Sequence, residues 1–214
     1  MNKKTILKYW QDCIKTTNPL IRDWLTKENL YLQKNIKKDS IVLDVGCGFG
    51  RNIKAIIRIA QKITGIDNNK KLFNKIKEKL SKFKNVEVFL EDAKKMHFSD
   101  NVFDYTICMG NTFGDFRKDK VGILKEMKRV TKKEGKIIIS VYSENALNTR
   151  IEEYEKVGVK IKKIRDGAVY TEDGLIFEQF TKPQLEKLFN STNLKVKILK
   201  LNNISYICEA IKER

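Results

Sequence analysis

Paired cysteines and long apolar runs are both missing from this 214-residue chain, and each absence excludes a class of protein. Its four cysteines, Cys13, Cys47, Cys108 and Cys208, lie far apart and form no Cys-x-x-Cys pair. Such spacing argues against a zinc site and against a disulfide framework, so we expect reduced thiols in a cytoplasm and no bound metal. Nowhere do 18 apolar residues follow one another, and the lysine-rich start of the chain contains no apolar run. We therefore expect neither an export signal nor a membrane span.

Acidic residues are few relative to basic ones. The chain has 27 Asp and Glu against 44 Lys and Arg, a formal net charge of +17. Such an excess favours a nucleic-acid partner, because lysine and arginine neutralise phosphates. Only eight of the basic residues are arginine, however, and the lysines are spread from Lys3 to Lys212. Phosphate and base recognition draws disproportionately on arginine, so a general compositional bias explains the charge as readily as RNA does. An RNA partner stays open.

The most informative stretch is residues 41–50, Ile-Val-Leu-Asp-Val-Gly-Cys-Gly-Phe-Gly. Five residues typical of a buried strand lead into glycines on alternate positions, and apolar residues then recur at helical spacing at Ile53, Ile56, Ile57 and Ala60. This pattern predicts a strand, a tight turn and a helix. Glycine permits positive φ and lets the backbone approach a ligand closely, so we expect a ligand to lie on this turn.

Two ligand classes use a turn of this kind. A dinucleotide fingerprint needs a further Gly or Ala at the position that Arg51 occupies. The spacing here is instead Gly-x-Gly-x-Gly, and with the preceding Asp44 it resembles motif I of the class I S-adenosylmethionine-dependent methyltransferases. The resemblance runs over residues 39–142 and is to small-molecule enzymes of the methyltransferase type 11/25 kind. A dehydrogenase remains the alternative for this turn.

The resemblance implies an EC 2.1.1.- enzyme that uses S-adenosyl-L-methionine and releases S-adenosyl-L-homocysteine. In the family this loop wraps the amino-acid end of the cofactor, a role that falls here on Gly46, Cys47 through its backbone, Gly48 and Gly50. We expect Asp44 to brace the loop by accepting backbone N–H bonds.

The end of the second expected strand carries Asp67, 21 residues after Gly46. A carboxylate there can accept hydrogen bonds from both hydroxyls of a ribose, and the spacing favours that role over an N-cap for the following helix. Asn68 is expected near the adenosine. After the third expected strand, Asp92 and Ala93 match the family position that holds the adenine, with a solvated loop acid as the alternative.

The fourth expected strand ends at Met109, Gly110 and Asn111, which the resemblance places beneath the sulfonium. The Gly-Asn-Thr-Phe stretch here is similar to the Gly-Asn-Ser-Phe of glycine N-methyltransferase-like enzymes. A polar turn that caps the next helix is the alternative interpretation. Two features of nucleic-acid enzymes are missing: an Asn/Asp-Pro-Pro-aromatic box and a Pro-Cys pair.

Few residues qualify for contact with the acceptor or for catalysis. Asp115 and Tyr142 follow the fourth and fifth expected strands and are candidate bases, although the sulfonium already activates the methyl carbon, so that a base is not required. Tyr9 and Phe113 are candidate substrate contacts. The single histidine, His97, is expected to be structural.

The predicted fold is one α/β domain over residues 1–214, a three-layer sandwich with a mostly parallel seven-stranded sheet whose seventh strand is antiparallel. We divide it into N-terminal helices (1–38), a cofactor-binding core (39–142) and a C-terminal part (143–214). Turn signals at Asp166-Gly167 and Asp173-Gly174 predict hairpins within about 158–180, an insertion expected to shape the substrate pocket.

The function predicted from sequence is methyl transfer to a small-molecule acceptor. An RNA methyltransferase acting on tRNA or rRNA, and a non-catalytic protein that binds S-adenosylmethionine, are the alternatives. The sequence predicts no oligomeric state.

Overall fold

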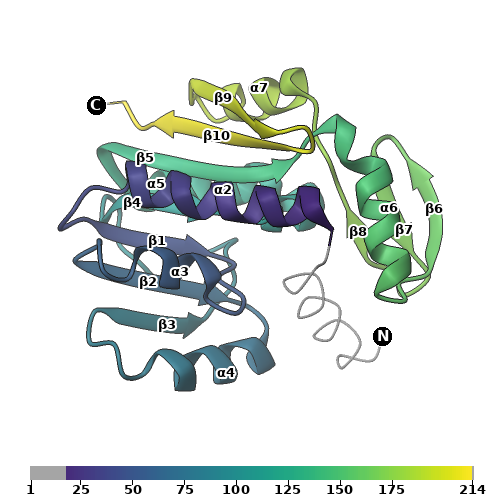
Figure 1. Ribbon diagram of the computed structural model, residues 1–214. Coiled ribbons are helices and arrows are strands. Elements are labelled where there is room, and N and C mark those ends of the chain that lie inside the picture. Colours follow the sequence, from purple (N-terminus) through teal and green to yellow (C-terminus); the bar gives the residue numbers. More distant parts are fainter. Residues whose placement is uncertain (1–17, 214) are drawn as a thin grey trace.

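A seven-stranded sheet forms the centre of the protein in the computed structural model, which describes residues 18–213 (Figure 1). Its strand order is β3-β2-β1-β4-β5-β10-β9. The strands are β1 (Ile41–Val45), β2 (Lys62–Asp67), β3 (Val86–Leu90), β4 (Phe103–Cys108), β5 (Thr131–Tyr142), β9 (Val196–Asn202) and β10 (Ser205–Ile211). Strands β1 to β5 pair in parallel, whereas β10 runs antiparallel to both β5 and β9. The predicted mostly parallel sheet with an antiparallel seventh strand is confirmed.

Helices cover both faces of this sheet (Figure 1). One face carries α2 (Pro19–Asn35), α3 (Arg51–Ile56) and α4 (Lys70–Leu80), and the other carries α5 (Lys120–Val130) and α7 (Lys182–Asn190). Successive side chains of each strand point to opposite faces of the sheet, so each strand contributes to the hydrophobic core on both sides. Val42 packs with the first group of helices, and its neighbour Leu43 packs with the second. The three layers of the predicted sandwich follow from this alternation.

Local signals set the helix starts. Asn18 caps α2, because its side-chain oxygen accepts from the backbone N–H of Leu20 and Ile21, and Pro19 takes the first helical position. Thr181 and Gln184 form a capping box at the start of α7. The helix predicted before α2, with Tyr9 and Cys13, lies outside the described residues.

Strand β5 begins earlier than expected. The sequence predicts a loop up to Gly135 and a strand from Lys136, but β5 starts at Thr131. Thr131 pairs with Phe103, and Lys136 pairs with Tyr105, so the residues between them bulge out of the ladder. Glu134 lies in that bulge and has a positive φ of 64°. The bulge was not expected, because Gly135 suggested that the strand begins after it.

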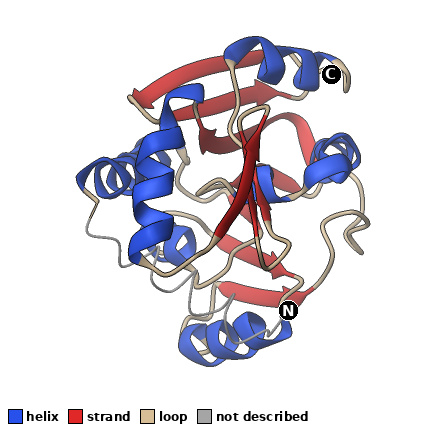
Figure 2. Cartoon of the chain, turned by 90° about the vertical axis from the view of Figure 1, so that its right-hand side faces the viewer, coloured by secondary structure: helices blue, strands red, loops and turns tan. Residues whose placement is uncertain are grey.

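A second, three-stranded antiparallel sheet lies beyond the carboxyl ends of the main strands, and Figure 2 looks onto it. It comprises β6 (Ile161–Arg165), β7 (Ala168–Thr171) and β8 (Ile176–Phe177), and packs against α6 (Leu147–Lys156). Asp166 and Gly167 both have positive φ, which is what the turn between β6 and β7 requires. The hairpins predicted within 158–180 are confirmed.

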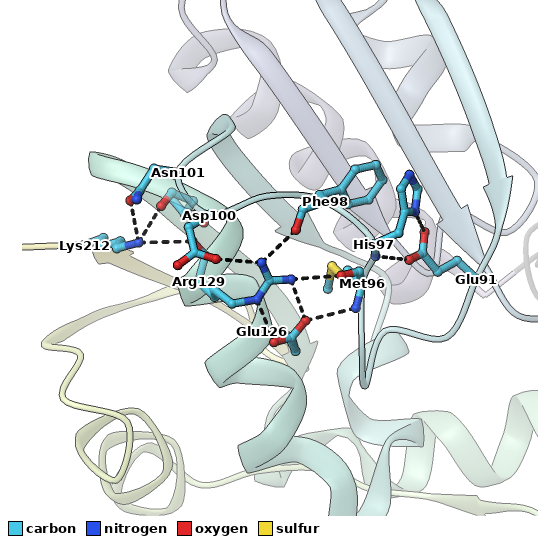
Figure 3. Close-up of polar contacts among 10 residues, drawn as sticks. Glu91, Met96, His97, Phe98, Asp100, Asn101, Glu126, Arg129 and Lys212 are labelled. Carbon is cyan, nitrogen blue, oxygen red and sulfur yellow. Dashed lines mark hydrogen bonds and ion pairs between the residues drawn. The ribbon is translucent and has the colours of Figure 1, made fainter.

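The segment between β3 and β4 is tied to α5 by Arg129 (Figure 3). Its guanidinium donates to the carbonyl oxygens of Met96 and Phe98 and pairs with Glu126 and Asp100. His97 belongs to the same segment, and its ring and backbone N–H both contact the Glu91 carboxylate, with Nδ1 2.7 Å from Oε2. The contact with Glu91 fits the structural role expected of His97.

Candidate functional site

The carboxyl ends of β1 to β4 open into a cavity of about 810 Å³, within the usual range for small-molecule sites. It lies where the strand order reverses between β1 and β4, the position at which open parallel sheets bind ligands. Loops after all four strands contribute to its wall, and so do α2, α6 and the small sheet; among the lining residues are Trp24, Gly46, Cys47, Gly48, Arg51, Asp67, Asn68, Asp92, Ala93, Met109, Gly110, Asn111, Asp115, Tyr142, Glu153, Tyr154 and Phe177.

The three glycines of the loop have different reasons to be glycine. All have positive φ: 71° at Gly46, 52° at Gly48 and 71° at Gly50. A Cβ on Gly46 would lie 2.3 Å from Cγ2 of Thr112, and one on Gly50 would lie 2.2 Å from Cδ1 of Ile76. A Cβ on Gly48 would meet nothing nearer than 4.0 Å. Gly48 therefore faces open space, whereas Gly50 is required for packing against α4 and does not line the cavity.

Asp67 holds the loop in place. Its Oδ2 accepts from the backbone N–H of Gly48 at 3.0 Å, and its Oδ1 from that of Asn69 at 2.8 Å. Burial raises the pKa of this carboxyl, and the two N–H donors act in the opposite direction. The alternative that Asp67 is an N-cap is wrong, because Asn69 caps α4 by accepting from Lys71 and Leu72.

Asp44 does not brace the loop, contrary to expectation. Its side chain is fully buried behind the loop, and neither carboxylate oxygen has a hydrogen-bond partner. Burial raises the pKa of Asp44 to about 7, although the nearby Arg51 and Asn52 side chains act to lower it. The brace comes instead from Asp67, which lies two residues beyond the register partner of Asp44, Gly65, and accepts from the Gly48 N–H.

A buried ion pair behind the loop is the feature that sequence reasoning missed. Glu28 of α2 is fully buried, pairs with Arg51 and accepts from the backbone N–H of Gly110 at 3.0 Å. Arg51 also donates to Asn29 Oδ1 and to the Leu25 carbonyl oxygen. One network thus joins α2, the glycine loop and the end of β4. A signal was present, because Glu28 continues the apolar stripe of Ile21, Trp24 and Leu32.

Met109, Gly110 and Asn111 line the cavity after β4. Asn111 has a φ of 63°, and its Oδ1 accepts from the Tyr142 backbone N–H at 3.0 Å. Its amide nitrogen donates to the Glu178 carbonyl oxygen at 3.1 Å. The alternative of a helix cap is wrong, since the Asn111 side chain makes no cap hydrogen bond to the following 3₁₀ turn (Thr112–Asp115).

Asp92 and Ala93 lie on the rim after β3. The Asp92 side chain is 52% exposed, accepts from the Lys94 backbone N–H at 3.0 Å and pairs loosely with the Lys94 ammonium. Ala93 is buried. The two residues stand beside Asp67 and Asn68 at the cavity wall, so four candidates for the adenosine end share one side of it.

The opposite end of the cavity holds the candidates for acceptor chemistry. Asp115 has a carboxyl whose pKa burial raises well above its usual range, despite Arg150 and Arg117 nearby. The Tyr142 ring lies 4.5 Å from that of Trp24 and 5.0 Å from the Arg150 guanidinium. Glu153 of α6, not anticipated from sequence, also lines this end.

Two substrate-contact predictions need comment. Phe113 is fully buried between the rings of Phe116 and Phe180 and does not line the cavity, because the 3₁₀ turn directs it into the core. Tyr9 lies outside the described residues. Leu175, Ile176 and Phe177 line the cavity, and the role of the 158–180 insertion in shaping a substrate pocket stays a prediction.

Comparison with known proteins gives matches along much of the chain. Residues 42–135 match a family model described as a methyltransferase domain. A demethylmenaquinone methyltransferase of Staphylococcus aureus is 30% identical over 146 residues, 64% of this chain and 60% of the relative. Cycloartenol-C-24-methyltransferase 1 of Oryza sativa subsp. japonica is 36% identical over 108 residues, 48% of this chain and 30% of the relative. The matches thus span less than two thirds of these curated relatives.

A solved structure is similar over nearly the whole chain. The crystal structure of a SAM-dependent methyltransferase from Aquifex aeolicus superposes with a TM-score of 0.68 at 20% identity, covering 94% of this chain and 97% of that one. At this identity the likeness concerns the fold. Within residues 18–213, no helix combines the length and the apolar character that crossing a bilayer requires.

Proposed function

We propose that this chain, whose residues 42–135 match a methyltransferase domain model, transfers a methyl group from S-adenosylmethionine to a small-molecule acceptor. The observation that carries the proposal is the cavity itself, because the glycine loop and the residues that follow β4 and β5 line one continuous space. A donor and an acceptor can therefore meet inside the protein.

The residues of the loop end fit the cofactor. Gly48 leaves open space where any other side chain would project, and Asp67 presents a partly buried carboxylate beside it. In the proposed arrangement the backbone at Gly46, Cys47 and Gly48 contacts the methionine part, and Asp67 accepts from the ribose hydroxyls. Asn68, Asp92 and Ala93 contact the adenosine. Bound there, the cofactor supplies a methyl carbon that its sulfonium charge has made electrophilic.

The chain's own contribution is orientation and exclusion of water. Met109, Gly110 and Asn111 line the cavity after β4, and Asn111 is fixed by hydrogen bonds with β5 and with the segment before Phe180. A rigid wall at this point holds an acceptor in line and desolvated, which supplies much of the rate in a displacement of this kind. Asp115 and Tyr142 remain the candidates for accepting a proton from the acceptor.

Two observations favour a small acceptor over RNA. Trp24, Tyr142, Tyr154 and the small sheet line the acceptor end of the cavity. The curated relatives are named as a demethylmenaquinone and a cycloartenol methyltransferase, and these names specify small-molecule acceptors for those proteins. RNA is kept as the second candidate because of the net charge of +17.

A labelling experiment tests the proposal. The pure protein is incubated with S-adenosylmethionine carrying a labelled methyl group and with a cell extract, which is then separated into RNA, protein and small-molecule fractions. Protein-dependent label in the small-molecule fraction is the expected result. Label in RNA would favour the second candidate. Cofactor binding without label in any fraction would favour a non-catalytic binding protein.

A further inference from the structure

Two acids at the acceptor end of the cavity each have one buried carboxylate oxygen without a partner. Asp115 Oδ1 and Glu153 Oε2 are both shielded from solvent and have no hydrogen-bond partner within the described part of the chain. They come from different elements, the 3₁₀ turn after β4 and helix α6, and both side chains line the same cavity. Buried carboxyl groups are nearly always hydrogen-bonded, so two exceptions in one cavity need an explanation.

The cations nearby are committed to other acceptors. The Arg150 guanidinium donates to Tyr154 Oη, Gln179 Oε1 and the Phe177 carbonyl oxygen. Lys120 pairs with Glu178. Arg117, Lys118 and Lys94 have exposed side chains at the rim. None of these groups donates a hydrogen bond to Asp115 Oδ1 or Glu153 Oε2, so both oxygens can accept from a ligand that carries N–H groups.

Aromatic rings surround the same end of the cavity. Trp24, Phe116, Tyr142, Tyr154 and Phe177 line it. Faces of aromatic rings attract a cationic nitrogen, and a carboxylate forms charge-assisted hydrogen bonds with an N–H group. Carboxyl groups set among rings therefore favour a nitrogen that carries hydrogen and positive charge on an apolar body.

We propose that the acceptor is a primary or secondary amine, which Asp115 and Glu153 bind and which is methylated on its nitrogen. This inference rests on the proposed function. This deepens the small-molecule proposal and gives Glu153 a role, that of a substrate-binding residue. An acceptor hydroxyl or an activated carbon would use one of the two acids at most.

The reaction is balanced without another reactant. The ammonium form of the amine gives one proton to a carboxylate of the pair and becomes a neutral amine. Its nitrogen lone pair forms the new bond to the methyl carbon while the carbon–sulfur bond breaks, and that electron pair stays on sulfur as a neutral thioether. The product leaves as an N-methylammonium ion, and the protonated acid returns its proton to water.

A carbon-13 label distinguishes the acceptor atoms. The protein is incubated with S-adenosylmethionine carrying a ¹³C-methyl group and with the small-molecule fraction of an extract, and the products are analysed by NMR, in which N-, O- and C-methyl groups have separate carbon shifts. New N-methyl signals are expected. O-methyl or C-methyl signals in their place would overturn the amine inference and leave the proposed function standing. Absence of S-adenosylhomocysteine binding by calorimetry would overturn both.

Variants test the two acids separately from the cofactor end. Asp115→Asn and Glu153→Gln are each expected to weaken binding of the identified amine at least tenfold, with affinity for S-adenosylhomocysteine changed less than twofold. Glu152→Gln is the matched control, since this exposed neighbour on α6 does not line the cavity. Unchanged amine affinity in both folded variants would overturn the assignment. If neither variant binds S-adenosylhomocysteine, Asp115→Ser and Glu153→Ala, which also remove the carboxylates, replace them, and amine affinity unchanged in both would overturn the assignment equally.

Discussion

Asp67 holds the glycine loop with one carboxylate oxygen and the residue before α4 with the other. Asp67→Ala removes the loop contact and, in the proposed complex, the acceptor for the ribose hydroxyls. We expect this change to weaken S-adenosylhomocysteine binding by about 1–3 kcal/mol, the usual cost of losing charge-assisted hydrogen bonds. Isothermal titration calorimetry measures it, with the exposed turn residue Asp173→Ala as control. Unchanged affinity in Asp67→Ala would remove the ribose assignment.

Asp44 makes stability depend on pH. Burial raises its pKa to about 7 in the folded protein, whereas an unfolded aspartate has a pKa of about 3.9. A carboxyl group whose pKa is raised in the folded state contributes its full stabilisation below pH 4, and that contribution is lost as the pH rises through 7. The difference of about three pKa units corresponds to at most about 4 kcal/mol.

The amide variant tests this dependence. Asp44→Asn cannot ionise. The difference in free energy of unfolding between this variant and the parent protein should therefore shift in favour of the variant from pH 5 to pH 8. Urea unfolding at the two pH values measures the difference. Asp39→Asn is the control, because Asp39 is exposed and its positive φ of 64° suits asparagine. An equal effect of Asp44→Asn at both pH values would show that Asp44 does not titrate in this range.

At the scale of elements, α2 is tied to the site by its buried glutamate. Glu28→Gln keeps an acceptor for the Gly110 N–H but leaves Arg51 without its counter-charge. Breaking a buried pair in this way typically costs about 3–5 kcal/mol. Asp23→Asn on the same helix removes a half-exposed pair with Lys27 and should cost less than about 1 kcal/mol. Chemical denaturation of both variants gives the comparison, and equal losses would contradict a special role for Glu28.

Elements with strong local signals were predictable. The apolar run of β1, the cap of α2 at Asn18 and the turn at Asp166-Gly167 all depend on residues next to one another in the chain. The bulge in β5 was not, because it is set by pairing with Phe103 and Tyr105, more than 25 residues away. A glycine before a strand is typical of a loop, and only the ladder across it shows the strand continuing.

The same distinction between local signals and distant contacts applies to the candidate site. Cavity residues on the loops after β1 to β4 could be found because a motif and its spacing mark them. Glu28 and Glu153 could not be assigned roles, because each is a polar residue on a helix whose meaning comes from contacts with distant segments. Asp44 and Phe113 were misplaced for a related reason: a position on or just after a strand does not show which way a side chain turns.

For the whole molecule, the excess of lysine brings ammonium groups close to one another and favours the binding of polyanions. The ammonium groups of Lys54 on α3 and Lys79 on α4 lie close together, and this contact, with burial and Lys82, lowers the pKa of Lys54 to about 8. No carboxylate pairs with either lysine within residues 18–213. Such clusters attract polyanions without selecting among them.

Salt separates this general attraction from the proposed reaction. RNA bound through lysines should lose affinity steeply between 50 and 200 mM salt, by about a thousandfold if six phosphates are contacted. Methyl transfer to an enclosed small acceptor should change much less, because buried contacts are poorly screened. Fluorescence anisotropy with a labelled RNA and methyl incorporation, both measured across the salt series, give the two slopes. If methyl transfer fell in parallel with RNA binding and the label entered RNA, the lysines would be part of the substrate site, and the acceptor would have to be sought on the surface rather than in the cavity.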